Sequence, residues 1–296
     1  MSCARVGMAA VVVLAACGDT GPPALPTGDA ARGATLFAAA AGCGCHTPEK
    51  GPVGAGGAEI VTPFGTFYGT NITPDRETGI GEWSDAEIDA AIRRGVVRGR
   101  GAEAPVMPYY RYAGMADRDA ADLIAHLRTL TPVRQPNREH EVGVPAARLA
   151  FALWRMLFAR GAGAAAAVPA APVARGGYLV DHVAICGDCH TPRGAFGHPD
   201  RRFYLAGSAD GPDGAVVPNI TPHDATGIGS WTAGDIAMLL ETGIKPDFDN
   251  VQGLMAALVD GHGGGPGYRH MPVADREAIG AYLRTVPPVA NAVDAE

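Results

Sequence analysis

The sequence predicts an all-α protein made of two tandem domains of one plan, joined by a helix and an Ala/Gly/Pro-rich linker. Its 296 residues are enough for about two domains of ordinary size. The chain also repeats itself: the run Asn-Ile-Thr-Pro at residues 71–74, with the Thr-Gly-Ile-Gly and the Trp that follow, returns at 219–222 with the same spacing. Apolar residues recur at helical spacing in both halves, and no alternating strand pattern competes with them.

The N-terminus has the pattern of an export signal. Arg5 precedes an apolar run over residues 6–16 that is too short to span a bilayer. The run Leu-Ala-Ala-Cys that ends at Cys17 resembles a bacterial lipobox, which predicts a lipoprotein-type signal peptide over residues 1–16 and an acylated Cys17, followed by a tether over residues 17–28. An ordinary signal peptide that happens to hold a cysteine is the alternative. We expect the protein on the periplasmic side of a bacterial membrane, lipid-anchored at Cys17.

Each half is expected to contain the same elements: a short helix, a Cys-rich segment, a Gly/Pro-rich loop, a helix after the Trp, and a closing helix. Ser84 and Glu87 form a capping-box pattern at the start of the helix after the first Trp, and residues 235–240 are its counterpart. Proline follows each closing helix. The closing helices are expected over Asp117–Leu130 and Asp275–Val286, and the two domains over residues 29–135 and 174–290.

An apolar segment lies between the two domains. Residues 148–160 form a predicted helix that contains Trp154, Leu157 and Phe158, and it is too short to cross a membrane. It either packs against one or both domains, or lies on a bilayer or docks a partner. Residues 161–174, almost all Ala, Gly and Pro, are expected to be a linker, so the connection as a whole covers residues 136–173.

The spacing of the cysteines in the second half indicates what they bind. In an oxidising compartment the default use of cysteine is a disulfide. Cys186 and Cys189 are three residues apart on a helical turn, so both thiols can form thioethers to the vinyl groups of one haem while the adjacent His190 binds its iron. A thioredoxin-like dithiol would need a βαβ setting, and a zinc site would need a second ligand pair. The motif therefore predicts a covalently attached haem c.

The first half has a contracted copy of this motif, with one residue between Cys43 and Cys45 before His46. Two positions on a helix are about 200° apart, so both thiols can reach the vinyl groups only with local distortion. We expect a second haem c bound through His46 and a thioether at Cys45. A strained double attachment, a free Cys43 thiol or no haem in this half remain open.

A methionine is the usual ligand opposite the histidine in an electron-transfer haem. In the first half Met107 lies in a loop after the second helix, a suitable place. In the second half Met255 is the better candidate, because a Gly-rich insert at residues 261–267 accounts for its greater distance from the closing helix. The competing residues are Met115, which is expected to be a packing residue, its counterpart Met271, and for bis-His ligation His262 and His270.

With these motifs placed, residues 29–288 resemble the tandem-haem c-type cytochromes that serve as electron-acceptor subunits of bacterial alcohol and gluconate dehydrogenases. The resemblance implies two cytochrome c-like domains and methionine ligands at Met107 and Met255, while the contracted first motif departs from the family pattern. It rests on residues 62–66, both Asn-Ile-Thr-Pro-to-Trp stretches, residues 107–109, the Trp154 helix, residues 186–192, and residues 246–249 and 252–255.

These features predict a dihaem electron carrier, not an enzyme, which takes electrons from a dehydrogenase and passes them to the respiratory chain. Its partners would be redox proteins and, through the anchor, the membrane. A net charge of −7 gives no reason to expect nucleic acid, which selects clustered Lys and Arg. The alternative is a dihaem peroxidase-like or small-molecule oxidoreductase with an open site on one haem, for which the irregular first motif is the candidate. A sensor would need an output domain.

Overall fold

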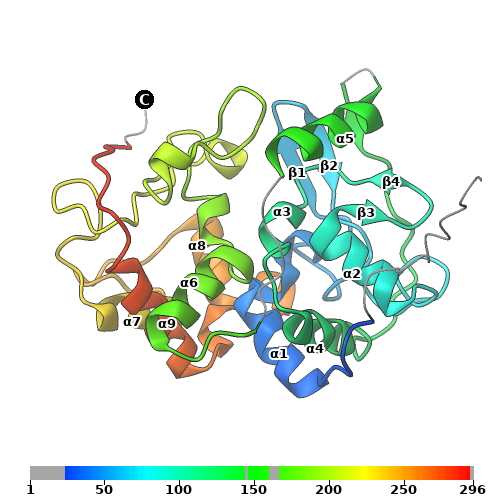
Figure 1. Cartoon of the computed structure of the whole chain (residues 1–296), viewed down its shortest axis with the longest axis horizontal. Helices are drawn as coiled ribbons and strands as arrows, with labels where there is room; N and C mark the ends of the chain where they lie inside the picture. The colour runs from blue at the N-terminus through cyan, green and yellow to red at the C-terminus, as the bar shows by residue number, and fades with distance from the viewer. Residues whose placement is uncertain (1–23, 144–145, 160–166, 294–296) are drawn as a thin grey trace, which may run out of the picture.

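The computed structural model describes residues 24–143, 146–159 and 167–293, and the predicted signal peptide and Cys17 lie outside these ranges. Figure 1 shows the first half, blue to green, beside the second half, green to red. Within the described ranges, no helix has the length and apolar character that a bilayer crossing requires.

The helices follow the predicted order in both halves. The predicted capping box of Ser84 with Glu87 is present, and the counterpart helix begins with a capping box of Thr232 with Asp235. The first half contains α1 (Ala30–Ala39), α2 (Asp85–Arg94), α3 (Tyr109–Tyr112) and α4 (Asp117–Leu127); α5 (Ala147–Phe158) connects the halves; the second half contains α6 (Pro172–His182), α7 (Ala233–Thr242), α8 (Gly253–Asp260) and α9 (Val273–Leu283).

The expectation of an all-α fold needs a correction, because the first half also contains short strands. β1 (Glu59–Thr62) and β2 (Gly65–Tyr68) form an antiparallel hairpin, and β5 (Glu141–Val142) pairs with the other edge of β2. β3 (Val96–Val97) and β4 (Gly101–Ala102) form a second hairpin. Strands of two to four residues are too short to produce a readable alternation of polar and apolar residues, so the sequence pattern did not reveal them.

Each half is built on a close crossing of its first and last helices. A Cβ on Gly33 of α1 would lie 1.9 Å from the carbonyl oxygen of Asp122 in α4, and a Cβ on Gly176 of α6 would lie 1.9 Å from that of Ala278 in α9. Only glycine allows this approach. The apolar core around the crossings contains Leu36, Phe37, Leu123, Ile124 and Leu127 in the first half, and Leu179, Val180, Ile279 and Leu283 in the second.

The connecting helix α5 packs against both halves. Its buried Trp154 lies 5.2 Å from the ring of Tyr110 in the first half and donates through Nε1 to the carbonyl oxygen of Phe196 in the second, at 2.8 Å. Phe158 stacks on His198 at 4.4 Å. Packing of this helix on both domains is thus confirmed, and α6 begins at Pro172, just inside the stretch predicted as linker.

Candidate haem sites

The two histidines of the Cys-rich motifs are held in the same way. His46 Nδ1 donates to the carbonyl oxygen of Thr70 at 2.8 Å, and His190 Nδ1 donates to that of Pro218, also at 2.8 Å. Burial lowers the pKa of both rings, against the effect of these hydrogen bonds, so the neutral imidazole is favoured. A neutral ring whose Nδ1–H is engaged keeps its Nε2 lone pair for a metal.

The carbonyl groups that orient these histidines directly precede the repeated Asn-Ile-Thr-Pro runs. The buried Asn219 donates through Nδ2 to the carbonyl oxygen of Val289 at 2.8 Å and accepts through Oδ1 from the backbone N–H of Thr221 at 2.9 Å. Asn71 makes the matching bonds in the first half, to Val133 and from Thr73. The repeat therefore fixes the loop that positions each histidine, a role that its spacing alone did not reveal.

The second motif forms a regular turn. Cys186 lies in the short 3-10 helix η2 (Cys186–Asp188), and the backbone N–H groups of Cys189 and His190 both donate to its carbonyl oxygen, at 3.3 and 3.0 Å. Both thiols are partly buried, and burial is the main cause that raises the pKa of each to about 12. The motif thus presents two protonated thiols beside one neutral imidazole, the donor set that a haem c requires.

The backbone of the first motif is distorted, as attachment through both of its cysteines would need. Within η1 (Ala41–His46), Gly42 and Cys43 have left-handed backbone with φ of 64° and 49°, and Ala41 has φ of 49°. The corresponding stretch of the second motif has a left-handed residue only at Ile185. Cys43 packs against the core, as Cys186 does, and burial raises the pKa of its thiol to about 12. Cys45 is exposed.

The candidate methionines differ in their environments. Met115 and Met271 are fully buried at the start of the closing helices, and their carbonyl oxygens accept from Arg93 and Arg276. Their matched positions confirm that they correspond to each other. Met107, just before α3, is partly buried, and Met255 in α8 is partly buried against the core. His262 lies beside Gly44 of the first motif, and His270 faces α1.

The two motifs lie near each other where the halves meet. Burial raises the pKa of Tyr112 well above its ordinary value, and the neighbouring Cys43, Cys45, Asp188 and Tyr268 raise it further. Burial, then Asp188, then Cys45 raise the pKa of Cys189. A tyrosine of the first half thus lies close to residues of both motifs.

Side chains of the first half also bond the second motif directly. The Tyr110 hydroxyl donates to Asp188 Oδ1 at 2.5 Å and accepts from Arg193 Nη1 at 2.8 Å, and Arg193 pairs with Asp188 Oδ2 at 2.7 Å. Arg111 Nη2 donates to the carbonyl oxygen of Gly187 at 3.0 Å. Gly187 and Asp188 are the two residues between the motif cysteines, so these first-half side chains hold the turn that would carry the second haem. We call Tyr110, Arg111, Asp188 and Arg193 the clamp.

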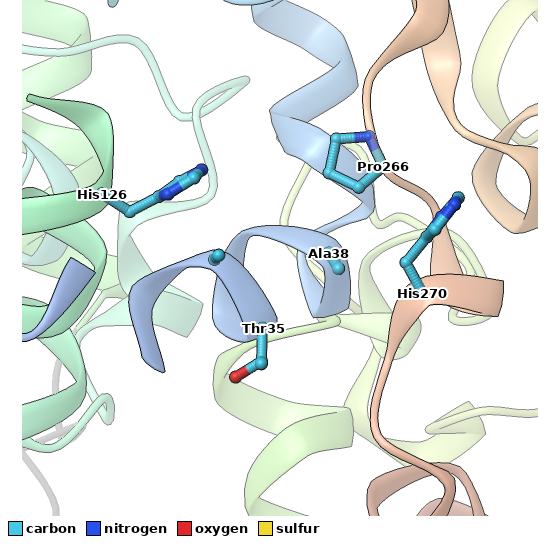
Figure 2. Close-up of a pocket in the computed structure, with 6 residues that line it drawn as sticks. Thr35, Ala38, His126, Pro266 and His270 are labelled. Atoms are coloured by element: carbon cyan, nitrogen blue, oxygen red, sulfur yellow. The ribbon is translucent and has the colours of Figure 1, made fainter. Parts of the chain in front are cut away.

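A hollow lies at the interface beside Thr35, the residue that the repeat relates to Tyr178. Figure 2 shows Ala38 of α1 toward Pro266 and His270, and His126 on the other side of the helix; with Thr35 these residues line a hollow of about 250 Å³. Thr35 occupies the repeat position of Tyr178, whose hydroxyl accepts from the Ala116 N–H at 3.1 Å and donates to Asp119 at 2.9 Å. The smaller threonine leaves this space, and the two sides of the interface are not equivalent.

Comparisons with known proteins agree with this geometry. Residues 30–131 match the cytochrome c family model. The chain is 37% identical to a "Diheme cytochrome c-type" protein of Cereibacter sphaeroides over 89% of its own length and 88% of that protein. It is also 34% identical to a gluconate 2-dehydrogenase cytochrome c subunit of Pantoea cypripedii over 86% of the chain, and 35% identical to a fructose dehydrogenase cytochrome subunit of Gluconobacter japonicus over 95%.

The chain spans 59% and 58% of the length of those two dehydrogenase subunits. It covers 88% of the dihaem relative. Each half places a pair of cysteines next to a partly buried histidine that bonds a carbonyl oxygen. Residues that spacing did not single out, Thr70, Pro218, Tyr110 and Arg193, complete the surroundings of the motifs. The chain belongs to the family of dihaem c-type cytochromes.

Proposed function

We propose that this protein carries electrons on two haem c groups at the periplasmic face of a bacterial membrane, accepting them from a dehydrogenase and passing them to the respiratory chain. The observation that carries the proposal is the duplicated site: each half aligns a neutral, carbonyl-bonded histidine with adjacent cysteines. Relatives that are named cytochrome subunits of gluconate, alcohol and fructose dehydrogenases support a dehydrogenase as donor.

Four side chains would hold the second haem. The Cys186 and Cys189 thiols would hold it through thioethers to its two vinyl groups, an addition of S–H that requires no oxidant. His190 Nε2 and the Met255 thioether would be the iron ligands. The bound haem contributes the one-electron cycle between Fe(III) and Fe(II), while the protein sets its potential and access.

We propose a double attachment for the first haem, with His46 and Met107 as iron ligands. The left-handed backbone from Ala41 to Cys43 supplies the distortion that a one-residue spacing needs, and Cys43 packs on the core as Cys186 does. The strain of left-handed non-glycine residues costs of order 1 kcal/mol each, which two covalent bonds can offset.

Intact mass and thiol alkylation of the purified protein test the cofactor content. We expect a covalent mass of two haems and no thiol of Cys43, Cys45, Cys186 or Cys189 open to iodoacetamide after denaturation. A mass of one haem would overturn the dihaem proposal, and one alkylated thiol at Cys43 would restrict the first haem to a single thioether.

Variants of the proposed methionine ligands test the iron sites, and fatty-acid labelling tests the membrane anchor. Met107→Ala and Met255→Ala should each convert one ferric haem to a high-spin, CO-binding form, with Met115→Ala and Met271→Ala as controls that lose stability instead. A first haem that is high-spin in the unaltered protein would favour the peroxidase-like alternative. Labelling with a fatty acid, absent from a Cys17→Ser variant, tests the anchor.

A further inference from the structure

The outward side of α5 is an apolar stripe. Leu149, Leu153, Met156 and Leu157 have the i, i+4, i+7, i+8 spacing of one helix face, and they are 62%, 45%, 49% and 62% exposed. Trp154 points the other way and is buried. Figure 1 shows α5 at the periphery of the molecule, beside β4. A run of large apolar side chains exposed together on one helix indicates an interaction surface.

The opposite side of α5 is held by the second half. Phe158 of α5 stacks on Phe196, with ring centroids 6.2 Å apart. The carbonyl oxygen of Phe196 accepts from Trp154 Nε1. Because α5 is held from this side, Leu149, Leu153, Met156 and Leu157 form an outward-facing surface, which we call the α5 face.

Basic side chains lie on α5 and on the hairpin beside it. The helix contains Arg148 and Arg155 and no acidic residue, and Arg155 bonds the carbonyl oxygens of Arg94 and Gly95 at the end of α2, at 3.2 and 3.3 Å. The adjoining β3–β4 hairpin adds Arg98 and Arg100, both exposed. Arg98 is balanced in part by Glu87 at 3.2 Å. Arginine is thus concentrated here in a chain whose net charge is −7.

We propose that the α5 face docks on an anionic lipid surface. Leucine and methionine side chains on one helix face can enter the boundary between headgroups and acyl chains while nearby arginines meet anionic headgroups, the composition of an interfacial helix. The net negative charge of the chain disfavours approach by other faces, so the bilayer selects this orientation. Docking extends the proposed function and does not depend on it, since no haem group takes part.

Docking would set the distance of one haem from the membrane. Trp154 packs on Tyr110, and Tyr110 bonds Asp188 in the second motif. The second haem-attachment turn is therefore two side-chain contacts away from the lipid-facing helix, and the α5 face would hold it in a defined position beside the bilayer.

Vesicle flotation of the full-length holoprotein tests the proposal. The Cys17→Ser background removes the acyl chain, and binding that is lost on substitution in α5 then reports contact by that helix. We expect binding to phosphatidylglycerol/phosphatidylethanolamine vesicles, weak binding to phosphatidylcholine vesicles, and a decline with added salt as the headgroup attraction is screened. Equal binding to both vesicle types, or no binding to either, would overturn the proposal.

Variants on this background locate the contact. Leu153→Gln and Leu157→Gln should each lower the partition coefficient roughly tenfold, the effect of withholding a leucine side chain from an apolar phase. Met156→Gln should lower it too, whereas Met238→Gln, 57% exposed on α7, should not. Arg148→Gln should weaken binding to anionic vesicles only, with the exposed Arg118→Gln as its control. Equal losses at the control positions, or concentration-dependent dimers that Leu157→Gln abolishes, would refute lipid docking.

Discussion

The contacts among Tyr110, Asp188 and Arg193 of the clamp predict that the first half stabilises the second haem-attachment turn. Tyr110→Phe removes one hydroxyl that donates to Asp188 at 2.5 Å and accepts from Arg193 at 2.8 Å. Asp188→Asn keeps the shape of the side chain but removes the charge that pairs with Arg193 at 2.7 Å. The two variants separate the hydrogen bond across the interface from the ion pair within the turn.

The size of each effect follows from burial. The Asp188 and Arg193 side chains are 19% and 31% exposed, so these bonds are partly shielded from water. A hydrogen bond to a charged group contributes about 1.5–3 kcal/mol. The Asp188–Arg193 pair survives in Tyr110→Phe, so we expect a loss of about 2 kcal/mol, within that range. Asp188→Asn leaves Arg193, and Arg111 whose Nε lies 3.9 Å from Asp188 Oδ1, without their carboxylate, and about 3 kcal/mol is expected.

Urea unfolding of the holoprotein, followed by far-ultraviolet circular dichroism and haem absorbance, measures both losses. The second half should unfold at lower urea in both variants, and the reduction potential of the second haem alone should rise in Asp188→Asn, because a negative charge near its iron is lost. Asp200→Asn is the control, since its pair with the largely exposed Arg202 lies within one loop and such pairs contribute about 1 kcal/mol or less. Unfolding free energies within about 0.5 kcal/mol of the unaltered protein for both clamp variants would refute the clamp.

Three further predictions concern the fold around the sites. Gly176→Ala should destabilise the second half by at least about 3 kcal/mol in thermal unfolding, because its Cβ would meet a carbonyl oxygen at 1.9 Å. The control Gly234→Ala on α7, whose Cβ has no contact closer than 3.6 Å, should be neutral or stabilising. Similar melting temperatures for the two variants would contradict this. Asn219→Ala should loosen the loop that bonds His190 and lower the recovered content of the second haem in pyridine haemochrome assays, and full occupancy would count against that role. Burial lowers the pKa of His126 below its ordinary 6.5, so its neutral form is favoured in the folded state. Its contribution to the unfolding free energy is therefore complete above pH 6.5 and is lost as the pH falls below that value. His126→Gln should flatten the dependence of stability on pH below 6.5.

Local sequence determined a large part of this protein. The capping boxes at Ser84 and Thr232, the order of helices and the duplicated plan depend on residues close together in the chain, and short-range hydrogen bonds and helical periodicity set them. The spacing of Cys186, Cys189 and His190 likewise fixes their relation on one turn. The missing residue of the first motif meant that attachment through both cysteines would need distorted backbone, and Ala41, Gly42 and Cys43 have left-handed backbone.

Only the tertiary structure decided what surrounds these motifs. The carbonyl partner of His190 lies 28 residues away, and Tyr110 meets Asp188 from 78 residues away; no local pattern encodes such pairs. The short strands depend on partners across the sheet. On α5, Trp154 faces the protein while Leu149, Leu153 and Leu157 face outward. Sequence periodicity marks an apolar helix, but which of its faces becomes buried depends on the surfaces that folding brings against it.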